Sequence, residues 1–222
     1  MKEKIGFVGL GIMGKPMASN LIDAEYSVNA YDLISDNVTS LIEKGIDSSS
    51  SPKEVSENSD VIIVMVQNSP QSEKAILGEN GILNGASKGN LIIDMSSISP
   101  LVSQKISKEW GRAKLIYGNN CIAHLNNLKD LMLGVKNLLT DDGIFVIECN
   151  YWGGMVKNTN YSLIYHDHFS YFSIKPWISF AKKYKMYPFD AVVTPAQGGS
   201  LRLFLSKKKL KKTKRFNNLL SE

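Results

Sequence analysis

Short apolar runs alternate with amphipathic stretches along the first hundred residues of the chain. The apolar runs are rich in Ile, Val and Phe and are bounded by Gly, Asp or Ser, which is typical of buried strands. In one amphipathic stretch, Met13, Met17 and Leu21 share a helical face. The predicted strands span residues 4–9, 27–32, 60–66 and 91–95, and helices are predicted over 13–24 and 37–45, from Pro52 and from Pro100. This alternation predicts an α/β fold with a doubly wound parallel (Rossmann-like) sheet.

The pattern continues differently in the second half of the chain. Residues 114–118 have the pattern of a strand, and residues 126–139 have that of an amphipathic helix. The "TDDG" of residues 140–143 is a turn signal, and "IFVIEC" at 144–149 is typical of a buried strand. Because both halves follow the same order of strands and helices, their strands could belong to a single sheet.

A glycine-rich stretch, "GFVGLGIMGKPMASN", joins the first predicted strand to the first predicted helix. Gly9 would permit a tight turn, Gly11 would let the backbone approach a pyrophosphate, and Gly14 would let the helix pack closely on the strand. Asp32 ends the second predicted strand, from which its carboxylate can accept hydrogen bonds from ribose hydroxyls. These features predict a dinucleotide site. Asp32 favours NAD over NADP, because it would repel a 2′-phosphate and no arginine follows it.

Three stretches of the first half resemble the N-terminal domain of the β-hydroxyacid dehydrogenases, the group that contains 3-hydroxyisobutyrate dehydrogenase and tartronate semialdehyde reductase. They are "GFVGLGIMGKPMASNL", "VIIVMVQNSPQ" and "IIDMSSISP", and the similarity covers roughly residues 3–107. The resemblance implies an NAD(P)-dependent oxidoreductase that acts on a small 3-hydroxy acid. The cofactor-binding residues that it implies are Gly9, Leu10, Gly11, Ile12, Met13, Gly14, Val66, Gln67, Asn68 and Ser97, and Ser96 would contact the substrate carboxylate. An alternative role for the serine pair is to cap the helix that begins near Pro100.

Members of that family continue into an all-helical domain that carries a catalytic lysine in a glycine-rich setting. No such setting follows residue 107, and the nearest lysines, Lys129 and Lys136, lie in a segment of different character. Hydride transfer needs an acid–base group within hydrogen-bond reach of the substrate oxygen. The sequence therefore supports nucleotide binding more strongly than turnover and leaves enzymatic activity open.

A second resemblance covers residues 113–206 and rests on "NNCIAHLNNLKD", "IYHDHFSYFS" and "QGGSLRLFL". In this order the motifs resemble the later half of S-adenosylmethionine-dependent sugar C-methyltransferases, which act on nucleotide-linked sugars. The resemblance implies that His168 is the base that forms an enolate. The other implied residues are His124, Tyr165, His166 and Asp167 around the base, and Gly198, Gly199, Ser200 and Arg202 in the sugar pocket. The chain departs from that family in having Asp167 in place of a glutamate and in lacking a counterpart of its cofactor loop.

Simpler interpretations of these residues stay open. Histidines beside aromatic rings are commonly hydrogen-bonded packing residues. Three histidines and Asp167 could bind zinc, but His166 and His168 form an i, i+2 pair without a third ligand at a defined spacing, so no metal is predicted. Gly198 and Gly199 could form only a turn or bulge before a strand.

Charge is concentrated at one end of the chain. The 222 residues carry 26 Lys and Arg against 21 Asp and Glu, and seven of these bases lie in "KKKLKKTKR" at 207–215. No aromatic platform or groove-reading motif accompanies this segment, so it is expected to be solvated and not to bind nucleic acid. The expected organisation is a dinucleotide-binding Rossmann domain over 1–107, a C-methyltransferase-like α/β segment over 108–206 and a basic tail over 207–222.

Other features of the sequence bear on the compartment and partners. The apolar runs are shorter than the roughly 20 residues that span a bilayer, and the N-terminus lacks the order of a signal peptide. Cys121 and Cys149 lie in apolar surroundings and form neither a CxxC pair nor a disulfide framework, which fits a reducing compartment. We therefore expect a cytoplasmic protein with a small-molecule substrate, no nucleic-acid or membrane partner, and the capacity to form a homodimer.

Three functions are consistent with the sequence. The first is an NAD(P)-binding oxidoreductase of the β-hydroxyacid dehydrogenase family, fused to a partial sugar C-methyltransferase. The second is a methyltransferase in which the glycine loop and Asp32 hold S-adenosylmethionine. The third is a catalytically inactive fusion that binds a nucleotide. The GxGxxG spacing suits a pyrophosphate over a helix terminus and so favours a dinucleotide.

Overall fold

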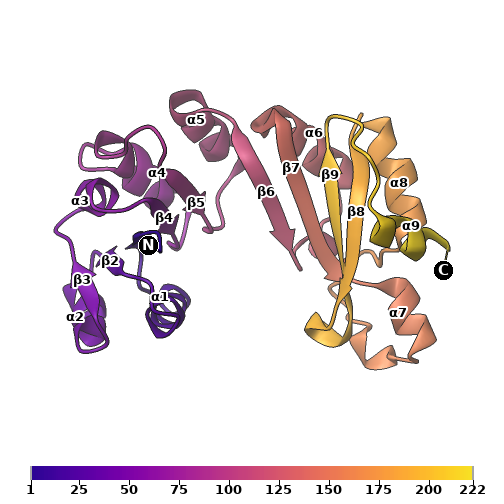
Figure 1. Ribbon diagram of the computed structural model, residues 1–222, viewed down its shortest axis with the longest axis horizontal. Coiled ribbons are helices and arrows are strands. Elements are labelled where there is room, and N and C mark those ends of the chain that lie inside the picture. Colours follow the sequence, from indigo (N-terminus) through magenta and orange to yellow (C-terminus); the bar gives the residue numbers. More distant parts are fainter. Residues whose placement is uncertain (1, 222) are drawn as a thin grey trace. The chain divides into compact units, whose positions relative to one another are not determined.

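The chain divides between Gly111 and Arg112 into two compact units (Figure 1). The structure, a computed structural model, describes residues 2–221. Among these residues each unit has its own sheet, one of five strands and one of four. The expectation that strands of both halves form one sheet is therefore wrong.

The first unit is an α/β domain with a wholly parallel sheet. Its elements are β1 (Ile5–Val8), α1 (Gly14–Asp23), β2 (Val28–Tyr31), α2 (Ser35–Ile42), β3 (Ile46–Ser48), α3 (Pro52–Glu57), β4 (Val61–Val64), α4 (Ser69–Leu77), the 3-10 turn η1 (Ile82–Asn84), β5 (Leu91–Asp94) and α5 (Pro100–Trp110). The strand order is β3-β2-β1-β4-β5, and every pair is parallel. This arrangement confirms the Rossmann-like sheet predicted for the first half.

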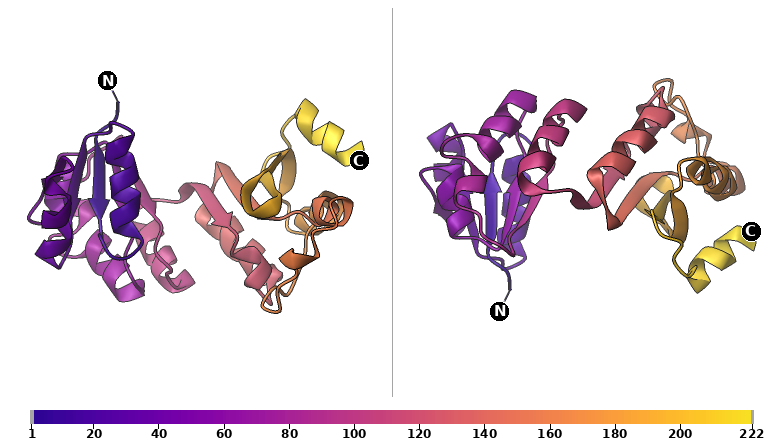
Figure 2. Two further views of the ribbon diagram at one scale, coloured as in Figure 1. Left: turned by 90° about the horizontal axis from the view of Figure 1, so that it is seen from below. Right: turned by 90° about the horizontal axis from the view of Figure 1, so that it is seen from above.

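Helices lie on both faces of this sheet (Figure 2), and each face has its own apolar cluster. Phe7 of β1 packs in a cluster with Ala18 of α1 and Val38 of α2. The next residue, Val8, packs in the other cluster with residues of α3 and α4, such as Ile76. Successive strand residues point to opposite faces, so a run that is apolar at every position is buried on both sides.

Polar caps fix where the helices of the first unit begin. Ser51 precedes α3, and its side chain accepts a hydrogen bond from the Glu54 N–H at 3.2 Å, as the serines before Pro52 predict. Asn68 caps α4 in the same way, at 3.1 Å from the Gln71 nitrogen. The sequence analysis did not predict α4, because its polar start follows β4 directly and resembles a loop.

The second unit has a mixed sheet. Its elements are β6 (Ala113–Asn119), η2 (Ile122–His124), α6 (Leu128–Leu138), β7 (Leu139–Asn150), α7 (Trp152–Lys157), η3 (Tyr161–Leu163), α8 (Ile174–Lys183), β8 (Tyr187–Thr194), η4 (Ala196–Gly198), β9 (Ser200–Ser206) and α9 (Lys214–Ser221). The order is β6-β7-β9-β8, with β6 parallel to β7 and β9 antiparallel to both of its neighbours. A parallel sheet therefore does not extend through the second half, because β9 runs opposite to the strands on either side of it.

Two local expectations for the second half differ from the structure. The "TDDG" segment at 140–143 lies inside β7 and does not form a turn. Ala113 pairs with Leu139, and regular pairing resumes at Leu115 with Ile144. Residues 140–143 therefore fall at a shift in the register of the two strands. The turn residues are accommodated by a bulge.

The basic segment at the C-terminal end is joined to the second unit. Phe216 of α9 is fully buried in the core of that unit. The Arg215 guanidinium donates from Nε to Asp190 Oδ1 at 2.6 Å, and Thr213 donates to the same oxygen at 2.5 Å. Residues 207–221 are therefore part of the folded unit and do not form a separate tail.

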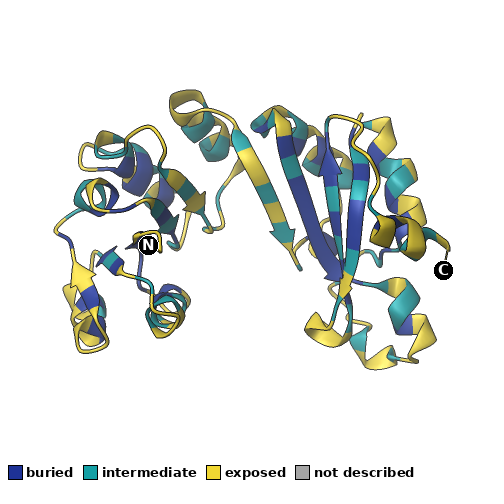
Figure 3. Cartoon of the chain, viewed as in Figure 1, coloured by how far each residue is buried: buried dark blue, intermediate teal, exposed yellow. Residues whose placement is uncertain are grey.

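The core of the second unit contains alternate residues of β7 and β9 and therefore lies on one face of the sheet. Figure 3 shows most of β7 in the dark blue of buried residues. Phe145 and Ile147 of β7 and Leu203 of β9 contribute from the sheet, and Met132 and Trp177 contribute from helices. Cys149 is buried in this core, whereas Cys121 is exposed, contrary to its expected apolar surroundings. Within the part of the chain that the structure describes, none of the helices combines the length and apolar character needed to cross a membrane.

Candidate functional site

A cleft of about 810 Å³ opens in the first unit at the carboxyl ends of its strands. It is lined by the segment after β1, by Tyr31 to Ile34 after β2, and by Met65 to Gln67 after β4. Ligands of open α/β sheets bind at this edge, where the strand order reverses. The volume lies within the range of cofactor pockets, roughly 300–1,000 Å³.

The three glycines of the loop after β1 differ in what surrounds them. A Cβ atom on Gly9 would lie 2.3 Å from the Met65 carbonyl oxygen, and Gly9 has a φ of +98°. A Cβ atom on Gly14 would lie 1.9 Å from the Gly9 carbonyl oxygen. At Gly11 a Cβ atom would have no neighbour within 4 Å. Gly9 and Gly14 therefore permit close packing, whereas Gly11 leaves space along the cleft for a ligand.

Asp32 connects the end of β2 to the glycine loop. Its Oδ2 accepts a hydrogen bond from the Leu10 N–H at 2.6 Å, and its Oδ1 accepts from the Ile34 N–H at 2.8 Å and the Asn37 amide at 3.1 Å. Leu10 itself is buried and does not line the cleft. Carboxylate oxygens have two acceptor sites each, so Asp32 can hold the loop and still accept from a ligand.

The structure brings most of the predicted cofactor-binding residues to one cleft. The predicted residues that line it are Gly9, Gly11, Ile12, Met13, Gly14, Asp32, Val66 and Gln67. Leu10, Asn68, Ser96 and Ser97 are not among the described residues that line it. The roles of all these residues in binding stay predictions.

The predicted serine pair lies next to the β4 loop. Ser96 accepts a hydrogen bond on Oγ from the Val66 N–H at 3.0 Å, which joins the segment after β5 to the segment after β4. Ser97 is exposed. The residue that caps α5 is Ser99, whose Oγ accepts from the Val102 N–H at 3.3 Å. The capping role considered for Ser96 and Ser97 therefore belongs to Ser99.

Sequence reasoning missed several residues of the cleft. Leu33 and Ile34, 68% and 61% exposed, follow Asp32 and give the cleft an apolar wall. Ser50, Ser51 and Lys74 line it from α4 and the start of α3. A signal for the apolar wall was present in the sequence, because two apolar residues directly after the strand-ending acid are unusual for a solvated turn.

The second unit brings together four predicted residues from two distant segments. His124 belongs to η2 after β6, and Tyr165, Asp167 and His168 lie in the segment before α8. His124 Nδ1 lies 3.2 Å from the Asp167 carbonyl oxygen and 3.4 Å from Asp167 Oδ2. The rings of His124 and His168 are 4.7 Å apart and edge-on. We call His124, Asp167 and His168 the histidine cluster.

Two tyrosine rings lie beside His168, outside the histidine cluster itself. The rings of Tyr165 and Tyr171 lie 5.0 and 5.5 Å from its ring. His168 Nδ1 is buried and has no hydrogen-bond partner among the described residues. The backbone fixes the position of this segment, because the Phe169 N–H donates to the Ala123 carbonyl oxygen at 2.8 Å. The cluster thus lies where β6 and its following turn meet the 165–172 segment.

The predicted sugar-pocket residues have structural partners. Ser200 is fully buried and donates to the Ala196 carbonyl oxygen at 3.0 Å. Gly198 and Gly199 have φ angles of +74° and +121°, as a turn before β9 requires. Arg202 donates from Nε to Glu148 Oε2 at 2.8 Å, on strands that pair at these residues. The structure does not bring Ser200 or Arg202 into the histidine cluster.

Glu148 is the centre of a buried polar network on the second sheet. Tyr117 donates to its Oε2, and Thr194 donates to its Oε1 at 2.9 Å. Burial raises the pKa of the Glu148 carboxyl, but the hydrogen bonds from Tyr117, Arg202 and Thr194 outweigh it and bring the pKa below its usual value. Desolvation and the neighbouring Glu148 raise the pKa of Tyr117. This arrangement is a satisfied structural network.

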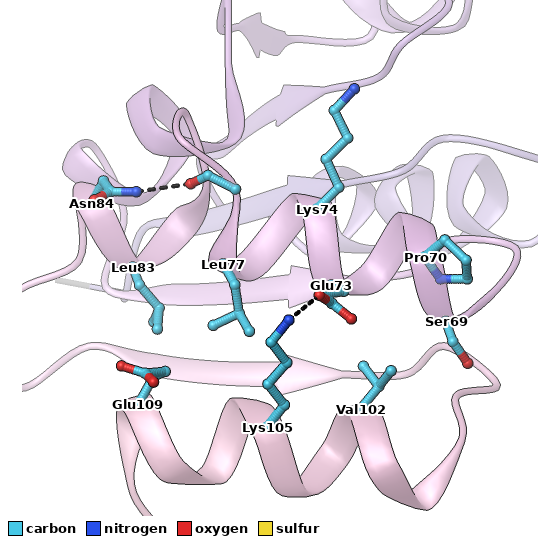
Figure 4. A pocket seen from close by; sticks show the side chains of 11 residues that line it. Ser69, Pro70, Glu73, Lys74, Leu77, Leu83, Asn84, Val102, Lys105 and Glu109 are labelled. Carbon is cyan, nitrogen blue, oxygen red and sulfur yellow. Dashed lines mark hydrogen bonds and ion pairs between the residues drawn. The ribbon is translucent and has the colours of Figure 1, made fainter.

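A second cavity of about 640 Å³ lies between α4 and α5 in the first unit (Figure 4). Glu73 of α4 and Lys105 of α5 form an ion pair across it. Leu77, Leu83 and Val102 supply its apolar wall, and none of the predicted site residues lines it.

Comparisons with known proteins agree with the geometry of the first unit. Residues 4–117 match the family described as the NAD binding domain of 6-phosphogluconate dehydrogenase. Mitochondrial 3-hydroxyisobutyrate dehydrogenase of Homo sapiens is 43% identical over 142 residues, covering 61% of this chain and 42% of the relative. The 2-hydroxy-3-oxopropionate reductase of Escherichia coli (strain K12) is 41% identical over 108 residues, covering 48% of this chain and 36% of the relative.

Among solved structures, a Mycobacterium tuberculosis 3-hydroxyisobutyrate dehydrogenase with L-serine is 20% identical, with a TM-score of 0.46. The match covers 71% of the present chain and 44% of the Mycobacterium tuberculosis chain. The chain spans less than half the length of the curated relatives it matches. The methyltransferase resemblance of residues 113–206 stays a prediction. Since the family match covers half of the sequence, the chain belongs to the family of the NAD-binding domain of 6-phosphogluconate dehydrogenase, and its curated relatives are 3-hydroxyisobutyrate dehydrogenase-like β-hydroxyacid dehydrogenases.

Proposed function

We propose that the first unit binds NAD(H) in the cleft beside the glycine loop and serves an oxidoreductase that acts on a small 3-hydroxy acid. The observation that carries this proposal is the combination of an open Gly11 with Asp32 on the neighbouring wall of one cleft. A pyrophosphate needs close backbone approach, and a ribose needs an acceptor at the end of the second strand. Both are present in one cavity of suitable volume.

The start of α1 supplies the phosphate-binding groups. This helix begins at Gly14, and its N-cap residue, Met13, makes no side-chain hydrogen bond to the first turn. The first N–H groups of a helix have no partner within it, and the helix dipole favours an anion there. An uncapped helix start that lines the cleft is therefore suited to a pyrophosphate.

The rest of the cleft suits an adenosine that carries a free 2′-hydroxyl. Asp32 would accept a ribose hydroxyl on Oδ2, which receives one hydrogen bond within the protein, and Leu33 and Ile34 offer an apolar surface to a flat ring. Of the described residues that line the cleft, Lys74 alone carries a positive charge. A 2′-phosphate close to the Asp32 carboxylate would be repelled, so NAD(H) is the favoured form.

Chemistry would take place at the end of the cleft that the segment after β4 lines, next to the segment after β5. A bound nicotinamide would accept or donate the hydride. Val66 and Gln67 line that part of the cleft, and Ser96 holds the Val66 N–H. Ser96 and the exposed Ser97 are the proposed contacts for a substrate carboxylate.

Parallel calorimetric titrations with NADH, NADPH and S-adenosylmethionine test this proposal. NADH should bind to one site per chain, NADPH should bind at least tenfold more weakly, and S-adenosylmethionine should give no heat. The substitution Asp32→Asn should reduce the preference for NADH, because it removes the charge that repels the 2′-phosphate. Asp36→Asn, at an exposed position of α2, is the matched control and should leave the preference unchanged. Equal affinity for the two dinucleotides, or binding of S-adenosylmethionine alone, would contradict the proposal.

A second candidate function is methyl transfer to a nucleotide-linked sugar by the second unit. It is favoured by the convergence of His124, Tyr165 and Asp167 around His168. His168 would act as the base, and His124 and Tyr165 would donate hydrogen bonds to the enolate oxygen. Heat from S-adenosylmethionine in the titration above, lost in His168→Gln, is the result expected of this function. A chain that binds NADH and lacks both activities would correspond to the inactive fusion.

A further inference from the structure

We propose that the histidine cluster binds a divalent transition-metal ion of the zinc type. Each of His124, Asp167 and His168 offers one ligand atom, and these three atoms lie within 4.8 Å of one another. Imidazole nitrogen and carboxylate oxygen are the ligand types that zinc and its neighbours prefer. The proposal concerns the second unit and is independent of dinucleotide binding in the first.

The distances within the cluster are close to those of a metal site. Zn–N and Zn–O bonds are about 2.0–2.2 Å, so two ligands of a tetrahedral ion lie roughly 3.3–3.6 Å apart. His124 Nδ1 and Asp167 Oδ2 are already 3.4 Å apart. The widest ligand pair, within 4.8 Å, needs to close by about 1.4 Å or less, which side-chain rotation can provide.

The surroundings of His168 also favour a cation. Its Nδ1 is buried and has no hydrogen-bond partner among the described residues. Buried ring nitrogens normally have a partner, and an ion held among these side chains would offer one. The Asp167 carboxylate supplies a negative charge within the cluster.

The backbone positions the ligands before an ion binds. His124 ends the turn η2, and the Phe169 N–H, next to His168, donates to the Ala123 carbonyl oxygen at 2.8 Å. This bond joins the two segments directly beside the ligands. Pre-positioned ligands reduce the ordering that an ion must impose when it binds.

The exposure of the cluster indicates an open site. The side chains of His124 and Asp167 are 43% and 57% exposed, so water or a substrate atom can complete the coordination. Three protein ligands with a free fourth position are typical of catalytic zinc sites, whereas structural sites are closed by four. A general base needs a free lone pair on a ring nitrogen. If the metal ion binds the same nitrogen of His168, that lone pair is occupied. The methyltransferase role and the metal role therefore make opposite demands on His168.

Calorimetric titration of the metal-free full chain with ZnCl₂ tests the proposal, with MgCl₂ as the comparison ion. We expect one zinc site per chain and no magnesium binding, since Mg²⁺ prefers oxygen ligands. His124→Ala and Asp167→Asn should each weaken zinc binding at least tenfold. His166→Ala removes a neighbouring histidine outside the cluster and should leave the affinity unchanged. Zinc affinity should fall as the pH is lowered through the range of histidine protonation, because metal-bound imidazole is neutral.

Imidazole ¹⁵N NMR of the unmutated chain gives a readout that does not depend on the folding of a variant. Zinc should shift the ring nitrogen signals of His124 and His168 and leave those of His166 in place. Absence of zinc binding to the unmutated chain would overturn the proposal. Retention of full affinity in both His124→Ala and Asp167→Asn would also overturn it, as would an equal loss in His166→Ala.

Discussion

The two units build their candidate sites from the sequence in different ways. In the first unit, Gly9, Gly11 and Gly14 lie within six residues between β1 and the start of α1, and Asp32 follows the next strand. In the second unit, His124 is separated from Asp167 and His168 by more than forty residues of sequence. A backbone hydrogen bond between Ala123 and Phe169 brings the two segments together. A site made within one βαβ unit leaves a signature in the local sequence. A site made by pairing distant segments does not.

The two units also differ in how they are stabilised. The first has two apolar clusters on opposite faces of a parallel sheet. The second has one large cluster and two buried carboxylates, Glu148 and Asp190, each paired with a partly exposed arginine. Each unit has its own core, so a substitution in one should leave the ligand affinity of the other unchanged. The predictions below test this separation.

The largest effect is expected from Phe216→Ala. This side chain of α9 is fully buried in the second core, and loss of a buried phenylalanine costs about 3–5 kcal/mol. Chemical denaturation followed by circular dichroism should show the second unit unfolding earlier, with NADH affinity unchanged. Leu210→Ala, at an exposed position in the same basic segment, is the control and should change the free energy of unfolding by no more than about 0.5 kcal/mol. Equal effects of the two would mean that α9 is a free tail.

Gly14→Ala should destabilise the first unit by about 1–3 kcal/mol and abolish NADH binding, because its Cβ would overlap the Gly9 carbonyl oxygen. The control is Gly11→Ala, where a Cβ meets no protein atom. This variant should keep the unfolding midpoint and lose NADH affinity, because the methyl group would lie where the pyrophosphate approaches. Thermal unfolding and NADH titration of both variants separate the two effects. NADH affinity retained in Gly11→Ala would place the dinucleotide elsewhere.

A smaller, pH-dependent effect is expected at Asp190. Hydrogen bonds from Arg215 lower the pKa of this carboxyl, and those from Thr213 lower it further. The folded-state pKa of Asp190 lies below the unfolded value of about 3.9. The stabilisation from its charge is therefore fully present above a pH of about 3.9, and it is lost as the pH falls through the folded-state pKa. Asp190→Asn should cost the second unit about 1 kcal/mol at pH 6, since Arg215 is half exposed and screened by solvent.

Denaturation of Asp190→Asn and the unmutated chain between pH 3 and pH 7 checks this expectation. The difference between them should shrink as the pH is lowered below about 4. Asp141→Asn, at an exposed acid of the same unit, should behave as the unmutated chain throughout. A constant difference across the range would show that the charge of Asp190 is not what stabilises the unit.

The smallest effect is expected from thiol modification. Burial raises the pKa of the Cys149 thiol to about 12, so the reactive thiolate is scarce at neutral pH. Cys121 is exposed, although partial desolvation also raises its pKa. A disulfide reagent at pH 8 should therefore modify one thiol per folded chain, slowly, and Cys121→Ser should abolish that reaction. Modification of two thiols without denaturant would mean that the second core opens.

Much of the first unit could be predicted because its signals are local. The apolar runs that became β1, β2 and β4 are buried on one or both faces, whereas the run that became β5 is partly exposed. The glycine loop lies between β1 and α1, as its spacing indicates. The bond from the Leu10 N–H to Asp32 could not be predicted, because it depends on how the loop folds over the end of β2. The helix α4 was missed for a similar reason, since its cap, Asn68, also suits a loop.

The second unit could be predicted only in parts. Its strands are evident from their apolar residues, but the order of the sheet and the reversed direction of β9 depend on long-range pairing. The turn expected at residues 140–143 became a bulge, because its neighbours on β7 pair with β6 on both sides. The resemblance to methyltransferases predicts that His124 and His168 belong to one site. The distance of 3.4 Å between His124 Nδ1 and Asp167 Oδ2, however, follows from the tertiary fold.

The most direct test of the central claim is to titrate NADH into the ¹⁵N-labelled chain and follow the backbone amide signals. The account predicts that the amides of Gly9, Gly11 and Gly14 and of the residues after Asp32 shift together with one affinity, while those of residues 112–221 stay in place. Amide signals of the glycine loop that remain unmoved at saturating NADH would contradict it.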